Sequence, residues 1–242
     1  MKRLRFSLPF PAVLLLLLAG LGAAVAEGDK KKTEEEKKPA APPDPNLVIK
    51  IDFEAAEAGA VPDALTVMDG EWSVAEIDGG KALRLAPAPL SESAVQLGAS
   101  QKGGGVITAR IRAEAGKRSH PRFGVALHGL AGFRLRLVPA RKTIELSKGD
   151  DILETAPHDW KKNGWVRLEL TVREKGEEAW TVEGRAWNEG KPRPEKPQIV
   201  HEATGVKLSG KGSVVGTPYT GLPIFYDDIE IRKTGAPPED AP

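Results

Sequence analysis

The chain has 242 residues, enough for one sizeable domain with tails. It contains no cysteine, which excludes a disulfide framework, an acylated lipoprotein cysteine and thiolate metal sites. Its 35 basic and 34 acidic residues nearly balance, which argues against a protein that binds nucleic acid or an anionic membrane.

The N-terminus has the three parts of an export signal. Lys2, Arg3 and Arg5 form a basic start, residues 12–25 are apolar, and Ala-Val-Ala at 24–26 is a small-x-small cleavage site. Residues 1–26 therefore predict a signal peptide, and the mature protein is expected to be secreted, periplasmic or in the cell envelope. A retained membrane anchor is the alternative, but the apolar run is short for a full span.

Two low-complexity segments flank the rest of the chain. Residues 27–46 combine Lys and Glu runs with a Pro/Ala run, and residues 234–242 are polar and rich in proline. Neither segment can bury much apolar surface, so we expect a disordered linker and a disordered tail. A single domain over residues 47–233 lies between them.

Residues 47–233 are dominated by short segments in which apolar and polar residues alternate. The clearest is 164–174, where Val166, Leu168, Leu170 and Val172 share one parity and charged residues share the other. Similar segments are 47–53, 63–67, 71–77, 82–85, 94–97, 106–113, 123–127, 133–137, 143–146, 152–155, 180–187, 199–202, 213–215 and 224–232. Turn residues separate them, including Asp-Gly-Gly at 78–80. The pattern predicts an all-β protein, a single antiparallel β-sandwich of jelly-roll type.

Several motifs resemble those of a known class. They are Gly-Glu-Trp-Ser-Val at 70–74, Gly-Gly-Lys-Ala-Leu-Arg at 79–84, Gly-Val-Ala-Leu at 124–127, Trp-Val-Arg-Leu at 165–168 and Phe-Tyr-Asp-Asp-Ile-Glu-Ile at 225–231. Over about residues 50–232 the chain resembles secreted bacterial proteins of the concanavalin-A-like lectin/glucanase jelly-roll class, near the 3-keto-disaccharide hydrolase-like and laminin-G-like domains. The resemblance implies a polysaccharide or glycan partner, met on a concave sheet face or at its rim. We expect a monomer that binds no nucleic acid and does not insert into a membrane after signal cleavage.

No catalytic set is predicted. A glucanase of this class would carry Glu-x-Asp-x-x-Glu on one strand, so that alternate carboxylates face one cleft. Residues 76–81 place Lys81 where the last Glu should be, and residues 52–57 have the acids in the wrong order. We therefore expect a non-catalytic domain that binds carbohydrate or an envelope surface. A glycoside hydrolase using Asp227, Glu169 and His128 is the first alternative, and a structural module of the envelope is the second.

The residues expected to contact carbohydrate are mostly arginines on the polar parity of long strands. If these strands share a sheet face, the guanidinium groups make that face cationic. Alternatively, Glu114, Glu145 and Glu169 pair with the arginines across strands and balance their charge on a solvated face. Trp165 is the best exposed aromatic candidate, whereas Trp72 and Trp180 are expected in the core. The predicted binding set is Arg110, Arg112, Arg134, Arg136, Arg167, Trp165, His128 and Tyr219.

A metal site is considered at one position only. The four histidines lack zinc-site spacing. Asp227 shares parity with the apolar residues around it, so its carboxylate needs a hydrogen-bonding partner, a bulge that turns it outward, or calcium bound together with Asp228. No other cofactor is expected.

Overall fold

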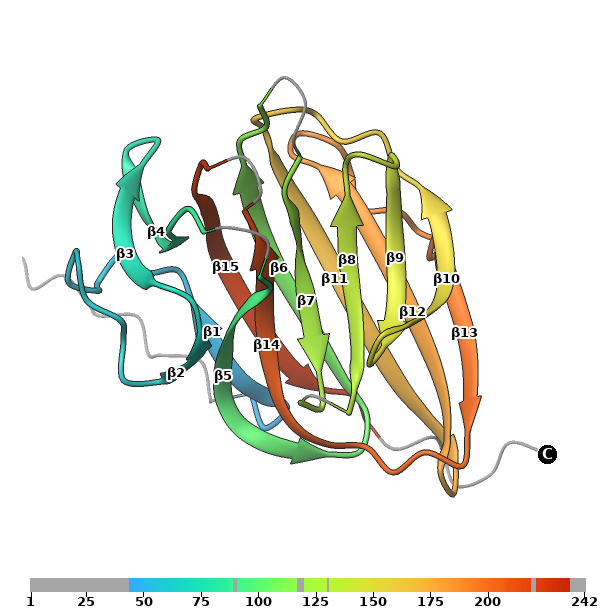
Figure 1. The fold of residues 1–242 in the computed structure, drawn as a ribbon. Coiled ribbons are helices and arrows are strands. Elements are labelled where there is room, and N and C mark those ends of the chain that lie inside the picture. Colours follow the sequence, from blue (N-terminus) through green and yellow to red (C-terminus); the bar gives the residue numbers. More distant parts are fainter. Residues whose placement is uncertain (1–43, 89–90, 117–119, 130, 219–220, 236–242) are drawn as a thin grey trace, which may run out of the picture. The chain divides into compact units, whose positions relative to one another are not determined.

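The computed structural model describes residues 44–88, 91–116, 120–129, 131–218 and 221–235 (Figure 1). The predicted signal peptide, most of the predicted linker, Tyr219 and most of the predicted tail lie outside these ranges. The described ranges contain no helix, and therefore none that could span a membrane.

Fifteen strands form within the described residues. They are β1 (Leu47–Ile51), β2 (Leu65–Asp69), β3 (Trp72–Ile77), β4 (Gly80–Leu85), β5 (Ser93–Lys102), β6 (Gly105–Ala113), β7 (Arg122–Leu127), β8 (Phe133–Val138), β9 (Thr143–Lys148), β10 (Asp151–Pro157), β11 (Trp165–Gly176), β12 (Ala179–Asn188), β13 (Ile199–Thr204), β14 (Ser209–Thr217) and β15 (Ile224–Lys233). Each overlaps one of the alternating segments predicted from the sequence, so the pattern located every strand.

The strands form two antiparallel sheets that pack face to face (Figure 1). Sheet A has the order β13-β12-β11-β6-β15-β4-β3, with β1 also paired to β15, and sheet B has the order β10-β9-β8-β7-β14-β5-β2. This confirms the predicted all-β antiparallel sandwich.

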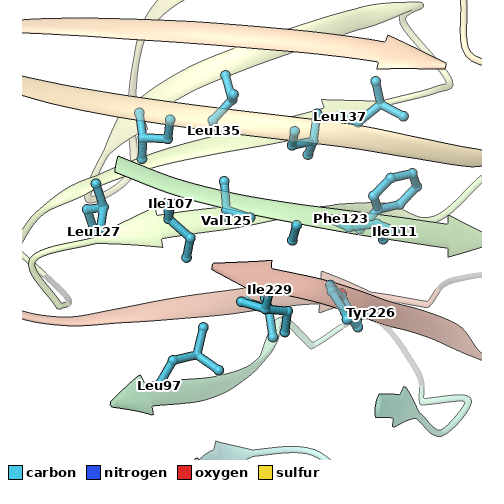
Figure 2. Packing of buried hydrophobic residues seen from close by; sticks show 14 of the residues in the cluster. Leu97, Ile107, Ile111, Phe123, Val125, Leu127, Leu135, Leu137, Tyr226 and Ile229 are labelled. Atoms are coloured by element: carbon cyan, nitrogen blue, oxygen red, sulfur yellow. The ribbon is translucent and has the colours of Figure 1, made fainter. Parts of the chain in front are cut away.

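The core lies between the two sheets and comes from one parity of each strand. Val166, Leu168, Leu170 and Val172 of β11 are fully buried, as their alternation predicts. Figure 2 shows side chains from sheet B, such as Val125 and Leu135, in the same apolar layer as those from sheet A. Burying one such aliphatic side chain contributes about 1.5–3 kcal/mol, so this layer is the main source of the domain's stability.

Tyr226 connects the two sheets by a hydrogen bond as well as by packing. Its side chain is fully buried, its ring lies 5.4 Å from that of Trp72, and its hydroxyl donates to the backbone carbonyl of Val215 at 2.8 Å. Tyr226 belongs to β15 in sheet A and Val215 to β14 in sheet B. The phenol therefore satisfies its polar atom inside the core.

A bulge divides β15 at Asp227 and Asp228. Asp227 pairs with Arg110, but Glu230 pairs with Thr108, so β15 has one residue more than β6 over this stretch. Asp228 adopts φ 47°, the left-handed conformation that a bulge requires. The bulge reverses the parity of the strand, so that Tyr226 and Ile229 both face the core while Asp227 faces outward. Two of the possibilities raised by the sequence are therefore observed together: the bulge turns Asp227 outward, and its carboxylate accepts a hydrogen bond from Arg110.

The two ends of the folded region lie side by side. β1 pairs with the second half of β15, with Leu47 opposite Arg232 and Ile51 opposite Ile229. The backbone amide of Lys233 also donates to the carbonyl of Asn46 at 2.8 Å. The chain therefore enters and leaves the domain at one position on sheet A.

Candidate functional site

The predicted arginines lie on two different faces of the sandwich. β6 and β11 are neighbours in sheet A and place Arg110, Arg112 and Arg167 on its outer face. β8 belongs to sheet B and places Arg134 and Arg136 on the opposite outer face. The condition for one shared cationic face is therefore not met, because sequence alternation gives the parity of a residue and not the sheet to which its strand belongs.

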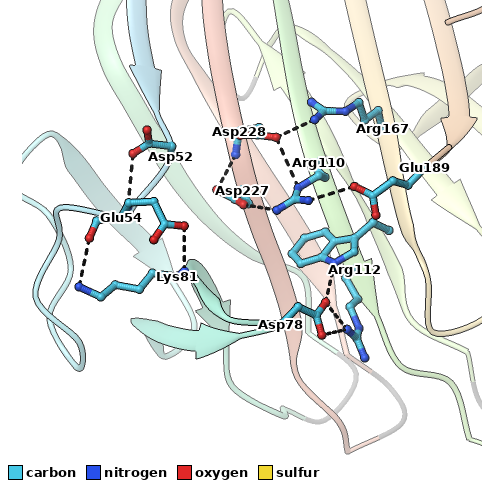
Figure 3. A network of polar contacts seen from close by, with 11 residues as sticks. Asp52, Glu54, Asp78, Lys81, Arg110, Arg112, Arg167, Glu189, Asp227 and Asp228 are labelled. Atoms are coloured by element: carbon cyan, nitrogen blue, oxygen red, sulfur yellow. Dashed lines mark hydrogen bonds and ion pairs between the residues drawn. The ribbon is translucent and has the colours of Figure 1, made fainter. Parts of the chain in front are cut away.

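The sheet-A arginines are paired with acids (Figure 3). One nitrogen of Arg110 donates to Asp227 at 2.5 Å and another to Glu189 at 3.0 Å. Arg167 donates to Asp228 at 2.6 Å. These donors are committed within the protein, which favours a structural ion-pair network on this face.

Trp165 is packed into that network instead of lying open. Only 7% of its surface is exposed, the Arg110 guanidinium carbon lies 4.2 Å from its ring centroid, and its indole N–H donates to Asp78 at 2.8 Å. Arg112 donates to the same carboxylate at 2.7 Å, and the hydrogen bonds from Arg112 and Trp165 lower the pKa of Asp78. The Asp78 carboxylate thus attaches the β3–β4 turn to the outer face of sheet A. The expectation that Trp165 is exposed was wrong.

Asp227 is nearly enclosed, and burial raises the pKa of its carboxyl even though Arg110 hydrogen-bonds to it. The described residues contain no group of three or more acids or histidines able to hold a metal ion. Both aspartates already accept hydrogen bonds from arginines. The calcium prediction for Asp227 and Asp228 therefore gains no support from this geometry.

His128 lies inside the domain and does not face a ligand. It is 2% exposed, and its Nε2–H donates to the carbonyl of Gly103 at 2.8 Å. Burial lowers the pKa of this histidine. The alternative catalytic set is also not assembled, because Glu169 and Asp227 lie on the outer face of sheet A, where Glu169 is held by Arg185 at 3.0 Å.

The two incomplete acid motifs meet at a cavity of about 380 Å³ beside the β3–β4 turn, which Glu54, Glu76, Asp78 and Lys81 help to line. The backbone amide of Lys81 donates to the Glu54 carboxylate at 3.1 Å, and its ammonium donates to the Glu54 carbonyl at 3.1 Å (Figure 3). The ammonium also donates to the carbonyl of Ala56 at 2.8 Å. These contacts fasten the turn to the segment that follows β1, which is a structural role.

The outer face of sheet B is hollowed. A cavity of about 270 Å³, called here the sheet-B hollow, is lined by residues of four neighbouring strands and β2: Met68, Asp69, Glu92, Ala94, Gln96, Ala126, Gly129, Arg134, Ser213 and Val215. Small side chains form much of this lining, which lets a ligand approach the sheet closely. The strands β8, β7, β14, β5 and β2 lie side by side in that order beneath it.

Glu92 is the centre of the polar groups in the hollow. One of its carboxylate oxygens lies 3.3 Å from Arg134 and the other accepts a hydrogen bond from Arg136 at 3.0 Å. Arg136 also donates to the Ser147 hydroxyl at 3.3 Å. The side chains of Arg134 and Arg136 are 16% and 17% exposed, and Glu92 holds both in place.

Of the residues predicted from the sequence, Arg134 lines the hollow and Arg136 contacts its Glu92, whereas the other polar residues of the hollow were not predicted. Glu92 and Asp69 lie at strand ends, whereas Gln96 and Ser213 lie on the outward parity of β5 and β14. Only the placement of β14 between β5 and β7 brings them beside β8. That pairing joins segments more than 80 residues apart, and local patterning carries no signal for it.

No family model matches the sequence, and no curated protein matches it. Several solved structures share its fold. A Bacillus subtilis protein described as having a galectin-like fold has a TM-score of 0.54 and 12% identity, over 79% of this chain and 98% of that one. A mutant of the alginate lyase Aly36B, solved with an alginate trisaccharide, has a TM-score of 0.52 and 10% identity, over 79% and 99%. The PL-14 alginate lyase from Aplysia kurodai has a TM-score of 0.52 and 10% identity, over 78% and 99%. The fold of this chain is the concanavalin-A-like jelly roll, the class that its motifs resemble.

Proposed function

We propose that this protein is a non-catalytic glycan-binding domain and that it binds carbohydrate in the sheet-B hollow. The observation that carries the proposal is the ion pair of Arg134 and Glu92 in the lining of a hollow that small side chains also line, with Arg136 fixing the same Glu92.

The chemistry of the hollow suits sugar hydroxyl groups, which both donate and accept hydrogen bonds. The guanidinium groups donate, the Glu92 carboxylate accepts, and the amide of Gln96 and the hydroxyl of Ser213 do both. Convergent polar groups over an apolar floor are typical of small-molecule sites. Because Glu92 fixes the two arginines in position, little side-chain entropy is lost when a ligand binds.

The position of Asp227, an acid with a raised pKa, favours binding over hydrolysis. Glycoside hydrolysis needs a carboxylic acid with a raised pKa beside a second carboxylate. Among the described aspartates and glutamates, a raised pKa is found at Asp227, which lies on the outer face of sheet A and not in the hollow. The described lining of the hollow also contains no histidine that could act as a base.

The fold supports a polysaccharide ligand in general terms. The Aly36B structure contains an alginate trisaccharide, and this chain shares its architecture. At 10% identity the similarity concerns the fold alone, so the sugar recognised here is left to experiment.

Export is the second part of the proposal, and it rests on residues 1–26. Sequencing the N-terminus of the protein recovered from the medium or envelope fraction tests it, with Glu27 expected as the first residue. An intact N-terminus in the cytoplasmic fraction would contradict export.

Binding is tested on a glycan array, with and without a calcium chelator. We expect saturable binding to one class of glycan and at least a tenfold loss in Arg134→Gln, because Arg134 lines the hollow and a hydrogen bond from a charged group contributes about 1.5–3 kcal/mol. Arg173→Gln is the matched control, since Arg173 is an exposed arginine at the far end of β11 on the other sheet. No binding under either condition, or equal losses in both variants, would rule out the hollow as a glycan site.

A further inference from the structure

A second cavity lies at one end of sheet B, apart from the hollow. It measures about 160 Å³ and is lined by His120, Pro139, Lys142, Asp159, Trp160 and Lys162. β7 and β9 begin at this end of the sheet, and β8 and β10 finish there, at the top of Figure 1. Since a water molecule occupies about 30 Å³ in the liquid, the space is large enough for one small polar ring.

The cavity is held open by backbone and ring contacts. Lys142 has φ 55°, and its backbone donates to the carbonyl of Pro139 at 3.1 Å and accepts from the amide of His158 at 2.9 Å. The carbonyl of Asp159 accepts from the side-chain amide of Asn188 at 2.8 Å. Both loops are therefore fixed in place, so the site is preformed.

Trp160 provides an apolar wall with a fixed orientation. Its indole ring is half-buried and packs edge-on against Phe123, with ring centroids 5.8 Å apart and planes at 67°. Its indole N–H, which can only donate, finds no acceptor among the described residues, and Nδ1 of His120 also has no hydrogen-bond partner there. The polar groups at this wall therefore lack an oxygen partner.

The charge of the cavity is positive. Two lysines line it against one aspartate. Neither lysine makes an ion pair within the described part of the chain; Lys162 has only a 3.5 Å contact to the carbonyl of Gly116. Both ammonium groups are therefore available for an external anion, and the cavity brings them to the same lining as Trp160.

We propose that this cavity binds a sugar that carries an oxyanion, either a carboxylate or a sulfate ester. The apolar face of the sugar ring packs on Trp160, and the anionic group lies between Lys142 and Lys162. The site is separate from the sheet-B hollow and does not depend on the function proposed for it.

Nuclear magnetic resonance of the full chain tests the proposal directly. The protein has five tryptophans, so its indole N–H resonances are few, and Trp160→Phe assigns the one that matters. We expect glucuronate and glucose 6-sulfate to shift this resonance saturably, and glucose and acetate to bind at least tenfold more weakly. Whichever charged sugar binds more tightly identifies the source of the oxyanion.

Lysine variants distinguish a loss of charge in the cavity from a loss of folding. Lys142→Gln with Lys162→Gln should raise the Kd for the charged sugar at least tenfold while leaving the other four indole resonances in place. Lys207→Gln, which alters an exposed lysine on another loop, should bind normally. If glucose binds as tightly as the charged sugars, the anionic group is not needed for binding. If acetate binds as tightly as they do, the sugar ring is not needed. Either result would contradict the proposal. Unchanged affinity in the double lysine variant would overturn the site itself.

Discussion

Replacing Arg110 with methionine is expected to destabilise the domain without affecting glycan binding. Methionine retains much of the apolar stem of arginine but removes the guanidinium that donates to Asp227 at 2.5 Å. Asp227 would then be left as a nearly buried carboxylate without its cationic partner, beside Asp228. The Arg110 guanidinium would also no longer cover the ring of Trp165.

The size of the effect follows from burial. Removing one partner of a buried ion pair costs about 3–5 kcal/mol. The side chain of Asp227 is 5% exposed but that of Arg110 is 25% exposed, so water screens the pair in part and we expect a loss near the lower limit, about 3 kcal/mol. For a domain of this size that corresponds to a fall in Tm of about 6–12 °C.

Urea unfolding at pH 7 measures the loss, and a second substitution tests its cause. Asp227→Asn in the Arg110→Met background removes the unpaired charge and should recover most of the lost stability. The Arg110→Met variant should still bind glycan like the parent protein. A loss below about 1 kcal/mol, or a loss of glycan binding at unchanged stability, would refute the structural role of Arg110 and restore it as a ligand-binding residue.

Two further predictions concern the core. Burial lowers the pKa of His128, so the unfolded chain binds more protons than the folded one below pH about 6.5. The free energy of unfolding should therefore keep its full value above that pH and fall as the pH drops through 6.5 and below. His128→Gln should make this fall less steep. An equally steep fall in the variant would contradict the assignment to His128. Tyr226→Phe removes the hydroxyl that donates to Val215 between the sheets and should cost about 1–2 kcal/mol in urea unfolding, whereas a neutral effect would show that this hydrogen bond adds nothing net.

The strands were predictable because each carries its own local signal. In β6 and β11 the apolar residues alternate with polar ones because one face of each strand is buried. The apolar residues between 107 and 111 and between 166 and 172 lie in the core, as this alternation predicts. The sheet to which a strand belongs depends on pairing between strands that are far apart in the sequence. This pairing places Arg110 on the outer face of sheet A and Arg134 on the outer face of sheet B. Of the residues that line the hollow, the sequence therefore pointed to Arg134 alone, and the others came together only when β14 and β5 were placed beside β7.

Exposure was harder to predict than parity. Trp165 does lie on the outward parity, but the β3–β4 turn folds over it and Asp78 binds its indole. His128 follows the last residue of β7 with φ 65°, so the alternation of the strand no longer fixes its direction. Lys142 and Lys162 lie in loops, where no periodic pattern marks a site. In each case a contact between distant segments decides the outcome.

The pairing of β1 with β15 has a consequence for how the domain is presented. A segment that precedes Leu47 leaves from sheet A, whereas the hollow is on the outer face of sheet B. Immobilising the protein through its N-terminus should therefore leave the hollow directed toward the bulk solution and open to long polymers. The adjacent ends also make the domain a candidate for circular permutation, with a short linker joining residues 233 and 47 and new ends at Gly149.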